Sequence, residues 1–465
     1  AAGSAVLAKP APEVPRCSEV VVDIAHRAGI PEDLLQLVPV PEDDVGRHLL
    51  TSVDGVVLTG GTDTAELFLS WDPAMRLFAE TSGKNAIVIT PNADLDLAVA
   101  DLVASAFGHA GQKCSAASLA ICVGDVYDSP RFRRQLVDAV ESLDVGPAHV
   151  PTTSMGPLIG EPNPRLAEAF TTLGPGEEWL VEPRLVDAAA HLWSPGVRVG
   201  VQRGSWFHRT ECFGPVLGLV RADDLDDAIA IQDDSAFGLT GGLHSLDPGE
   251  VERWTARVEV GNAYVNRTIT GAIVQRQPFG GWKGSSVGPG AKAGGPGYVA
   301  QLGTWHPTGP LEQSVWEASD DRWWRSVYGV GHDPAALFCE SNLLRYRPRA
   351  RVALRIGPGA DEAAVARVRH AAATCGVPLV ESDHATEPDG DLAARLRSLG
   401  VERVRVVGEV GDEVRRAAAA GRIHVDDDPV TADGGVELRR YLREQVVTRT
   451  LHRFGNLVQS GADAV

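Results

Sequence analysis

Short apolar runs alternate with longer amphipathic runs along this chain, and this alternation limits its possible folds more than any other feature. The runs at residues 55–59, 86–90 and 118–123 are short for helices but fit buried strands. Between the second and third runs, residues 94–107 place most of their apolar side chains on one helical face. Strands and helices that alternate in this way build a parallel sheet, because each helix carries the chain back to the edge where the previous strand began. The pattern therefore predicts an α/β fold.

A second series of alternating elements follows a stretch that is rich in tryptophan. Apolar runs at 352–356 and 404–407 flank an amphipathic run at 361–375. This order predicts a second, small Rossmann-like α/β domain at the C-terminal end. We expect residues 436–456 to form a charged helix and a strand-like end that docks on another domain or subunit.

The charge and the cysteines of the chain exclude several classes of partner. A net charge of −19 argues against nucleic acid or an anionic membrane, since both would repel the protein. It does not exclude a small anionic substrate. The six cysteines show no CxxC pair and no metal-ligand spacing, so we expect reduced thiols, no metal site and a cytoplasmic location. No apolar run reaches the roughly 18 residues that a membrane span requires.

One cysteine occupies a position that suits a nucleophile. Cys114 follows the helical run and two glycines, Gly108 and Gly111, and it precedes the apolar run at 118–123. A thiol on a glycine-bounded loop between two packed elements can be held rigidly and still be reached by a substrate. Considered alone, however, such a residue is more often a small, semi-buried structural cysteine.

Three other motifs favour the nucleophile. They are Glu80-Thr-Ser-Gly-Lys-Asn85, Glu211-Cys-Phe-Gly-Pro215 and Gln277-Pro-Phe-Gly-Gly281. Together with Cys114, and with Lys9-Pro10 after the first strand, they resemble the NAD(P)-dependent aldehyde dehydrogenase superfamily in order and spacing. The resemblance covers residues 1 to about 305. It implies a partial Rossmann-type cofactor domain followed by an α/β catalytic domain.

The resemblance also assigns the catalytic residues. It implies that Cys114 attacks the aldehyde and that Glu80 is the general base. The resulting thiohemiacetal would pass a hydride to the nicotinamide and become a thioester, which a water activated by Glu80 would hydrolyse. The backbone N–H of Cys114 would donate to the oxyanion. An isolated glutamate at the end of a helix would more simply be solvated, but the motif around Glu80 favours catalysis.

NAD is the cofactor that the resemblance implies. It assigns five residues to this cofactor, namely Lys9, Gly60, Gly61, Glu211 and Phe213. Lys9 would bond the adenosine ribose, the two glycines would turn beside the pyrophosphate, and Glu211 would bind the nicotinamide ribose. The glycine turn alone is weak evidence, because it is not the GxGxxG fingerprint. Pro12 stands where the family often has an acid, so NADP is not excluded.

A closer resemblance concerns the substrate. Residues 270–297 are similar to loops of L-glutamate γ-semialdehyde dehydrogenases, especially those in bifunctional proline-utilisation enzymes, and residues 339–348 and 441–447 look like the long members of that group. It implies that Ser115 and the backbone N–H groups of Gly271-Ala272 bind the substrate α-carboxylate. Phe279 would contact the aliphatic stem. A simple loop bend is the alternative for Gly271-Ala272.

The implied function is NAD-dependent oxidation of L-glutamate γ-semialdehyde, formed from 1-pyrroline-5-carboxylate, to L-glutamate in the second step of proline catabolism. We divide the chain into four parts on this basis. They are a partial NAD-binding domain (1–83), a catalytic domain (84–285), a loop and connector (286–348) and a C-terminal α/β domain without an active site of its own (349–465).

The chain has no initiator methionine, and its first residues lie almost within a strand. We therefore expect a fragment of a homo-oligomeric enzyme in which an FAD-dependent proline dehydrogenase domain is fused upstream. In the family, an upstream asparagine completes the oxyanion hole, so we expect residues 1–465 alone to be weakly active or inactive. Two alternatives stay open, namely a dehydrogenase of another acidic semialdehyde and a non-catalytic structural fragment.

Overall fold

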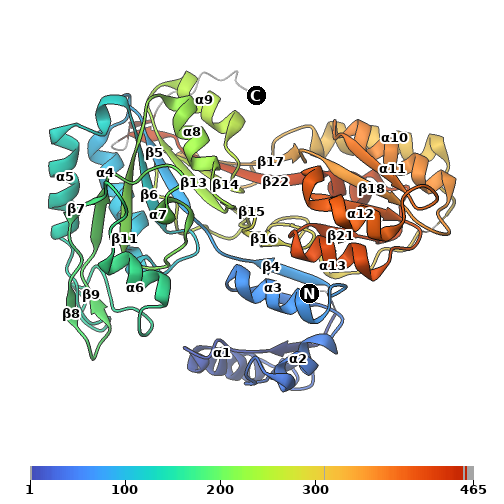
Figure 1. Cartoon of the computed structure of the whole chain (residues 1–465), viewed down its shortest axis with the longest axis horizontal. Coiled ribbons are helices and arrows are strands. Elements are labelled where there is room, and N and C mark those ends of the chain that lie inside the picture. Colours follow the sequence, from blue (N-terminus) through green and yellow to red (C-terminus); the bar gives the residue numbers. More distant parts are fainter. Residues whose placement is uncertain (1–2, 308, 454–455, 458–465) are drawn as a thin grey trace.

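The computed structural model describes residues 3–307, 309–453 and 456–457. One sheet of nine strands dominates these residues (Figure 1). In spatial order the strands are β17 (Glu340–Pro348), β22 (Leu442–Thr450), β14 (Asn262–Val265), β13 (Thr240–His244), β5 (Asn85–Ile89), β6 (Ala117–Val123), β11 (Val216–Ala222), β10 (Gly196–Val199) and β7 (Glu178–Val181). The strands from β22 to β10 run parallel, while β17 and β7 pair antiparallel at the two edges. The predicted α/β fold with a parallel sheet is confirmed.

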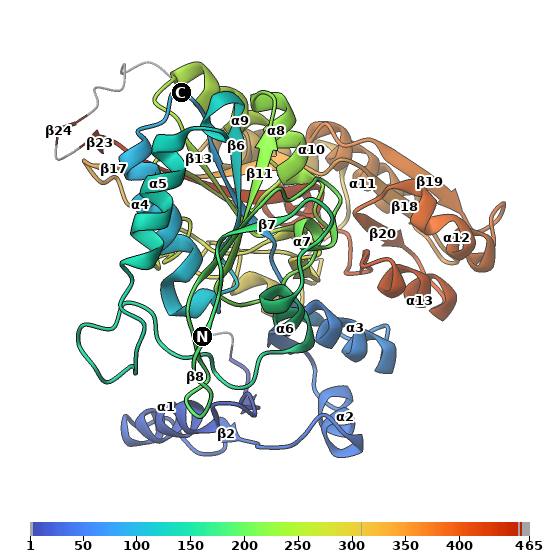
Figure 2. The same cartoon turned by 60° about the vertical axis from the view of Figure 1, so that its left-hand side comes forward.

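Helices cover both faces of this sheet (Figures 1 and 2). On one face lie α4 (Leu95–Phe107) and α5 (Pro130–Glu141), and on the other lie α8 (Leu225–Asp233) and α9 (Pro248–Arg257). The central strand β5 is therefore buried along its whole length. This double covering explains why the apolar runs of the sequence are continuous rather than alternating.

The N-terminal part of the chain forms two small sheets beside the large one. Its elements are β1 (Val6–Ala8), α1 (Pro15–Arg27), β2 (Leu35–Leu37), α2 (Asp44–Thr51), β3 (Val56–Thr59), α3 (Thr62–Trp71) and β4 (Leu77–Glu80). β1 pairs with β2, while β3 pairs with β4, and β16 (Ser286–Val287) joins β4 from the other side. Glu80 thus ends a strand and not a helix. The sequence-based placement was wrong because residues 77–80 form a strand too short to be recognised by periodicity.

The remaining elements of the first 310 residues are short. They are α6 (Pro164–Thr171), α7 (Trp206–Arg209), β8 (Leu185–Asp187), β9 (Leu192–Trp193), β12 (Phe237–Gly238), β15 (Trp282–Lys283) and 3₁₀ turns at Gly108–Gly111, Gly124–Val126 and Ala300–Leu302. β12 and β15 pair with each other.

The predicted second α/β unit is present. Its sheet contains β19 (Leu379–Asp383), β18 (Val352–Ile356), β20 (Arg403–Val407) and β21 (His424–Asp426), all parallel. Its helical segments are α10 (Gln313–Trp323), a π turn at Trp324–Tyr328, α11 (Glu362–Thr374), α12 (Asp389–Arg395), a 3₁₀ turn at Leu396–Leu399, α13 (Asp412–Ala420), α14 (Gly434–Glu437) and a 3₁₀ turn at Leu438–Tyr441. A last short hairpin joins β23 (His452–Arg453) and β24 (Asn456–Leu457).

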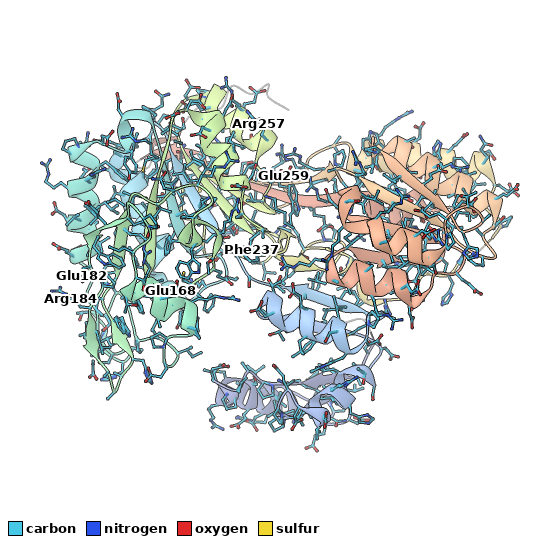
Figure 3. The ribbon with its side chains drawn as sticks, viewed as in Figure 1. Glu168, Glu182, Arg184, Phe237, Arg257 and Glu259 are labelled. Carbon is cyan, nitrogen blue, oxygen red and sulfur yellow. The ribbon has the colours of Figure 1, made fainter. Side chains whose placement is uncertain are left out.

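Two strands tie this second unit to the large sheet. β17 and β22 pair over nine residues, and β22 also pairs with β14 of the catalytic part. The sequence division at residue 349 assigns β22 to the C-terminal domain, whereas its hydrogen bonds place it in the large sheet. Arg443 of β22 also donates to Glu259, which Figure 3 labels on the side of the catalytic part that faces the second unit. β17 lies within the predicted connector, and its residues do not predict a strand because polar and charged side chains interrupt the apolar positions.

Gln445 is the polar side chain that fastens β22 at this junction. It is fully buried, donates to the carbonyls of Val258 (3.3 Å) and Val260 (2.8 Å), and accepts from Arg345. A leucine in its place would leave these buried partners without their hydrogen bonds. Each such loss costs about 1–3 kcal/mol.

We therefore predict that Gln445→Leu lowers the free energy of unfolding by about 2–4 kcal/mol in urea titrations. Arg449→Gln, at a half-exposed position on the same strand, serves as the control and should change it by less than about 0.5 kcal/mol. Equal unfolding midpoints for the two variants would show that Gln445 does not hold the junction.

Candidate active site

The loop that carries Cys114 is bent sharply as it leaves α4. His109, Ala110 and Gly111 all have positive φ, at 56°, 53° and 66°. A side chain at Gly111 would collide with the carbonyl of Gly214, so only glycine fits there. The bend returns the chain toward the first residues of β5 and β6 and leaves Cys114 half-buried.

Asn85 holds this loop in place. Its Nδ2 donates to the carbonyls of Cys114 (2.8 Å) and Ala116 (3.0 Å), and its Oδ1 accepts from the N–H of Thr240 (3.0 Å). The Thr240 hydroxyl in turn donates to the carbonyl of Ser115 (3.2 Å). Sequence reasoning gave Asn85 no role. The signal was available, because Asn85 closes the motif that begins at Glu80.

Glu80 reaches the site from the end of β4. Its Oε2 accepts from the N–H of Gly281 (2.8 Å), which belongs to the Gln277–Gly281 motif. Burial raises the pKa of Glu80 to about 7, against the opposing charge of Lys292. A carboxyl group with such a pKa can take up a proton near neutral pH, as a general base must.

Glu211 is the second carboxylate that acts on Cys114. Its Oε1 accepts from the N–H of Gly83 at 2.7 Å, and burial raises its pKa above the ordinary value. Phe213 follows with a φ of 59° and remains partly exposed. Together with Gly83 and Gly111, these two residues line a small cavity of about 20 Å³ beside the cysteine loop.

The surroundings disfavour a free thiolate at Cys114. Burial raises the pKa of the thiol, and the carboxylates of Glu80 and Glu211 raise it further. The N–H groups of Ser115 and Cys114 oppose this effect by donating toward the sulfur. The structure therefore brings Cys114, Glu80 and Glu211, predicted from three separate motifs, into electrostatic contact.

The other predicted cofactor residues lie in the N-terminal part. Gly60 and Gly61 form an exposed turn between β3 and α3, and the N–H of Gly60 donates to the carbonyl of Glu80 (3.2 Å). Lys9 follows β1 in the separate two-stranded sheet, and its Nζ lies 3.3 Å from Glu42. The glycine turn is thus linked to the catalytic strand, while the predicted role of Lys9 stays a prediction.

The predicted substrate residues come from three segments. Ser115 is buried beside the cysteine, and Phe279 is fixed by paired backbone hydrogen bonds with Ala293. Gly271, with a φ of 80°, and Ala272 form an exposed turn. Among the described residues no hydrogen bond joins this turn to Ser115, so their joint binding of a carboxylate stays a prediction.

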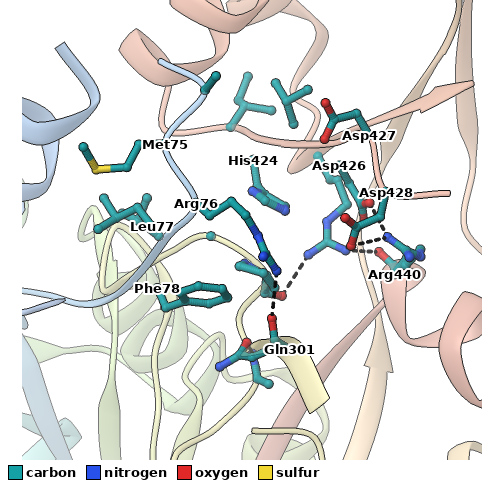
Figure 4. A pocket seen from close by; sticks show the side chains of 18 of the residues that line it. Met75, Arg76, Leu77, Phe78, Gln301, His424, Asp426, Asp427, Asp428 and Arg440 are labelled. Atoms are coloured by element: carbon teal, nitrogen blue, oxygen red, sulfur yellow. Dashed lines mark hydrogen bonds and ion pairs between the residues drawn. The ribbon is translucent and has the colours of Figure 1, made fainter. Parts of the chain in front are cut away.

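Larger cavities lie away from Cys114, where the N-terminal part and the segment after residue 280 meet the second α/β unit. One of about 190 Å³ is lined by Arg76 and Gln301 on one side and by Asp426 and Arg440 on the other (Figure 4). Most of its charged groups are already paired. Arg440 contacts Asp426, and Arg76 donates to the backbone of Gly303 (3.0 Å). The chemistry of the three motifs is therefore not located in this cavity.

The raised pKa of Cys114 has a measurable consequence. We predict that the alkylation rate of Cys114 by iodoacetamide rises with pH without reaching a plateau below about pH 9. Glu80→Gln removes one repelling carboxylate and should move this profile to lower pH. Mass spectrometry of the Cys114 peptide measures the rate, and Cys114→Ser identifies the label. A plateau at neutral pH in the unmodified protein would contradict the prediction.

The chain is similar to known proteins in sequence and in structure. Residues 1–302 match the model of the aldehyde dehydrogenase family. A 1-pyrroline-5-carboxylate dehydrogenase from Geobacillus kaustophilus is 36% identical over 308 residues, which cover 64% of this chain and 59% of that protein.

Two solved structures are also similar to the chain. Proline utilization A (PutA) from Corynebacterium freiburgense is 49% identical with a TM-score of 0.89, and the match covers 98% of this chain and 48% of that one. A 1-pyrroline-5-carboxylate dehydrogenase from Thermus with bound NAD is 31% identical with a TM-score of 0.60, over 64% of this chain and 59% of that one. The chain thus spans only about half to three fifths of these proteins. The predicted resemblance is confirmed, and the chain belongs to the aldehyde dehydrogenase family.

Proposed function

We propose that this chain oxidises L-glutamate γ-semialdehyde to L-glutamate, with NAD as the electron acceptor. One observation carries the proposal. A buried carboxyl group, Glu80, with a pKa raised to about 7, acts electrostatically on the thiol of Cys114 in a chain of the aldehyde dehydrogenase family. The names of the similar proteins support the choice of substrate.

In the proposed reaction, the thiol of Cys114 gives its proton to the solvent, and its sulfur forms a bond to the aldehyde carbon. The backbone N–H of Cys114 donates to the oxygen that becomes negative. A bound nicotinamide cofactor would supply the acceptor for the hydride of this carbon, and Cys114 would then hold the acyl group as a thioester. Glu80 then takes a proton from water, whose oxygen attacks the thioester carbon. The C–S bond breaks, the acid leaves, and Glu80 passes the proton to the sulfur to restore the thiol.

Several features of the described residues fit a nicotinamide cofactor. Gly60 and Gly61 are exposed just before α3, and Gly61 at the N-cap position has no side chain to cap the helix, which suits an anionic pyrophosphate. The N–H of Thr62, the first residue of the helix, donates instead to the Ser82 hydroxyl at 3.2 Å. Glu211 offers a carboxylate beside Cys114, and Phe213 lines the same small cavity. We propose NAD over NADP, and the NAD-bound Thermus structure supports this choice.

We also propose that the complete protein is longer and carries an FAD-dependent proline dehydrogenase domain upstream. The similarity to PutA, which this chain covers to 48%, supports this arrangement. Apolar side chains on α1 are exposed, including Val21 (64%) and Ile24 (55%), as expected for a surface that another part of the protein covers.

We propose a homo-oligomer in the cytoplasm, a location that the six free cysteines support. Among the described residues, no helix is long and apolar enough to cross a membrane.

The proposed substrate gives a test at Ser115. Loss of one hydrogen bond to the substrate α-carboxylate costs about 1.5–3 kcal/mol, so Ser115→Ala should lower kcat/KM for L-glutamate γ-semialdehyde by roughly 10- to 100-fold. Pentanal has no α-carboxylate, and its kcat/KM should change little. Ser115→Thr keeps the hydroxyl and serves as the matched control. An equal loss for both aldehydes would argue for another substrate.

A second test compares residues 1–465 with the longer polypeptide that we propose. If an upstream asparagine completes the oxyanion hole, the short chain lacks one donor, and its kcat should be lower by at least about 100-fold. NADH formation at saturating aldehyde measures this difference. Equal turnover by the two polypeptides would refute the proposed role of the upstream residues.

A further inference from the structure

A single peptide group connects Glu80 to a buried lysine on a different segment. This peptide group joins Gly280 to Gly281. Its N–H donates to Oε2 of Glu80 at 2.8 Å, and its carbonyl accepts from Nζ of Lys292. An ammonium group on the carbonyl polarises the peptide group and makes its N–H a stronger donor. The positive charge therefore favours the ionised form of Glu80, although the two side chains form no direct ion pair among the described residues.

Lys292 is held firmly in this position. It is 1% exposed, and its Nζ also donates to Oδ1 of Asn262 at 3.1 Å. The same oxygen accepts from the N–H of Gly280 (3.2 Å), so Asn262 aligns both groups. A Cβ atom at position 280 would lie 2.9 Å from Oε1 of Glu80, so a larger residue there would displace the carboxylate. The lysine, the peptide group and the glutamate thus form one packed unit.

The C-terminal strand β22 contributes to this unit. Oε2 of Glu444 accepts from the backbone N–H of Lys292 at 2.9 Å, and Glu444 is almost fully buried. Its other oxygen, Oε1, makes no hydrogen bond among the described residues and lies 3.8 Å from the Arg439 guanidinium. Burial lowers the pKa of Lys292 to about 8, and the carboxylates of Glu80 and Glu444 oppose this effect by Coulomb attraction. Glu444 lies within residues 349–465, which the sequence analysis expected to have no active site of their own.

A purely structural role for Lys292 is the alternative. A buried lysine could merely fasten the loop by its two hydrogen bonds. A neutral donor would serve that purpose at a lower desolvation cost, because a fully buried ammonium group is unfavourable without a charge to stabilise. Two carboxylates, those of Glu80 and Glu444, attract the ammonium group and supply that reason.

We propose that Lys292 is a positioning residue for the general base. Its ammonium group, acting through the Gly280–Gly281 peptide group, holds the Glu80 carboxylate in place and in its ionised form, and Glu444 of β22 supports the lysine. This inference rests on the proposed function of Glu80. It makes a residue of the C-terminal segment part of the electrostatics of the catalytic site.

The sign of the expected pH effect follows from the charges around Glu80. Burial raises the pKa of Glu80 to about 7, and Lys292 lowers it from what burial alone would give. Cys114 and Tyr298 are the other titratable groups that interact with Glu80, and the Ser286 hydroxyl also donates to it. Loss of the Lys292 charge therefore raises the pKa of Glu80. As the pH falls, the ionised base is then protonated at a higher pH than in the unmodified enzyme, and the acidic limb of the activity profile moves to higher pH.

The test measures the pH dependence of kcat in the full-length native polypeptide with NAD and L-glutamate γ-semialdehyde. In Lys292→Met, the midpoint of the acidic limb should rise by about one pH unit, which lowers kcat at pH 7 about fivefold. Lys292→Arg retains the charge and should keep the midpoint near that of the unmodified enzyme. Lys283→Met removes a lysine of β15, whose Nζ donates to the Asp233 carbonyl, and should leave the profile unchanged.

An unchanged acidic limb in folded Lys292→Met, or an equal shift in Lys283→Met, overturns the proposal. If Lys292→Met does not fold, the acidic limb of kcat is measured in Glu444→Gln instead. This variant should shift the limb in the same direction, because a lysine without Glu444 loses its proton more easily, and an unchanged limb overturns the proposal. The alkylation rate of Cys114 reports on Glu80 without substrate. Suppose that the unmodified protein does not oxidise the aldehyde but that Lys292→Met shifts the alkylation profile of Cys114. This result would refute the proposed function and would still support the effect of Lys292 on Glu80.

Discussion

The hydrogen bonds of Asn85 to the cysteine loop are the interaction on which the rest of the site depends. One buried amide at the start of β5 satisfies the carbonyls of Cys114 and Ala116 and accepts from Thr240 on β13. It thereby joins the loop before β6 to the ends of two neighbouring parallel strands. Buried backbone groups need partners, and here one side chain supplies them while it leaves the thiol of Cys114 accessible.

Glu80, the proposed general base, depends on a second long-range contact. Glu80 belongs to the small sheet of the N-terminal part, but its carboxylate is fixed by Gly281, which lies 201 positions further along the chain. The loop around Gly281 is fixed in turn by Lys292 and by Trp282, whose indole N–H donates to the Glu444 carbonyl at 2.8 Å. Base, loop and C-terminal strand therefore form one continuous structure, and the large sheet is the frame that holds them together.

The sequence predicted the parts of this structure that local patterns encode. The α/β class followed from short apolar runs and helical periodicity, and Cys114, Glu80 and Glu211 followed from three spaced motifs. The functions of Asn85 and Lys292 could not be predicted, because they consist of hydrogen bonds to backbone groups that only the fold brings near. β17 was missed for a similar reason. It is a strand because it pairs with β22, roughly 100 residues later, and its own residues, such as Arg345 and Arg347, do not alternate clearly.

The most direct test of the account is to isolate the covalent intermediate. In Glu80→Gln the base is lost, so the thioester should accumulate when NAD and L-glutamate γ-semialdehyde are added to the full-length polypeptide. Acid quenching and mass spectrometry of the peptides would locate it. The account predicts a glutamyl adduct on the peptide that contains Cys114, and none in Glu80→Gln with Cys114→Ala. A burst of NADH without an adduct on Cys114, or an adduct on another cysteine, would contradict it.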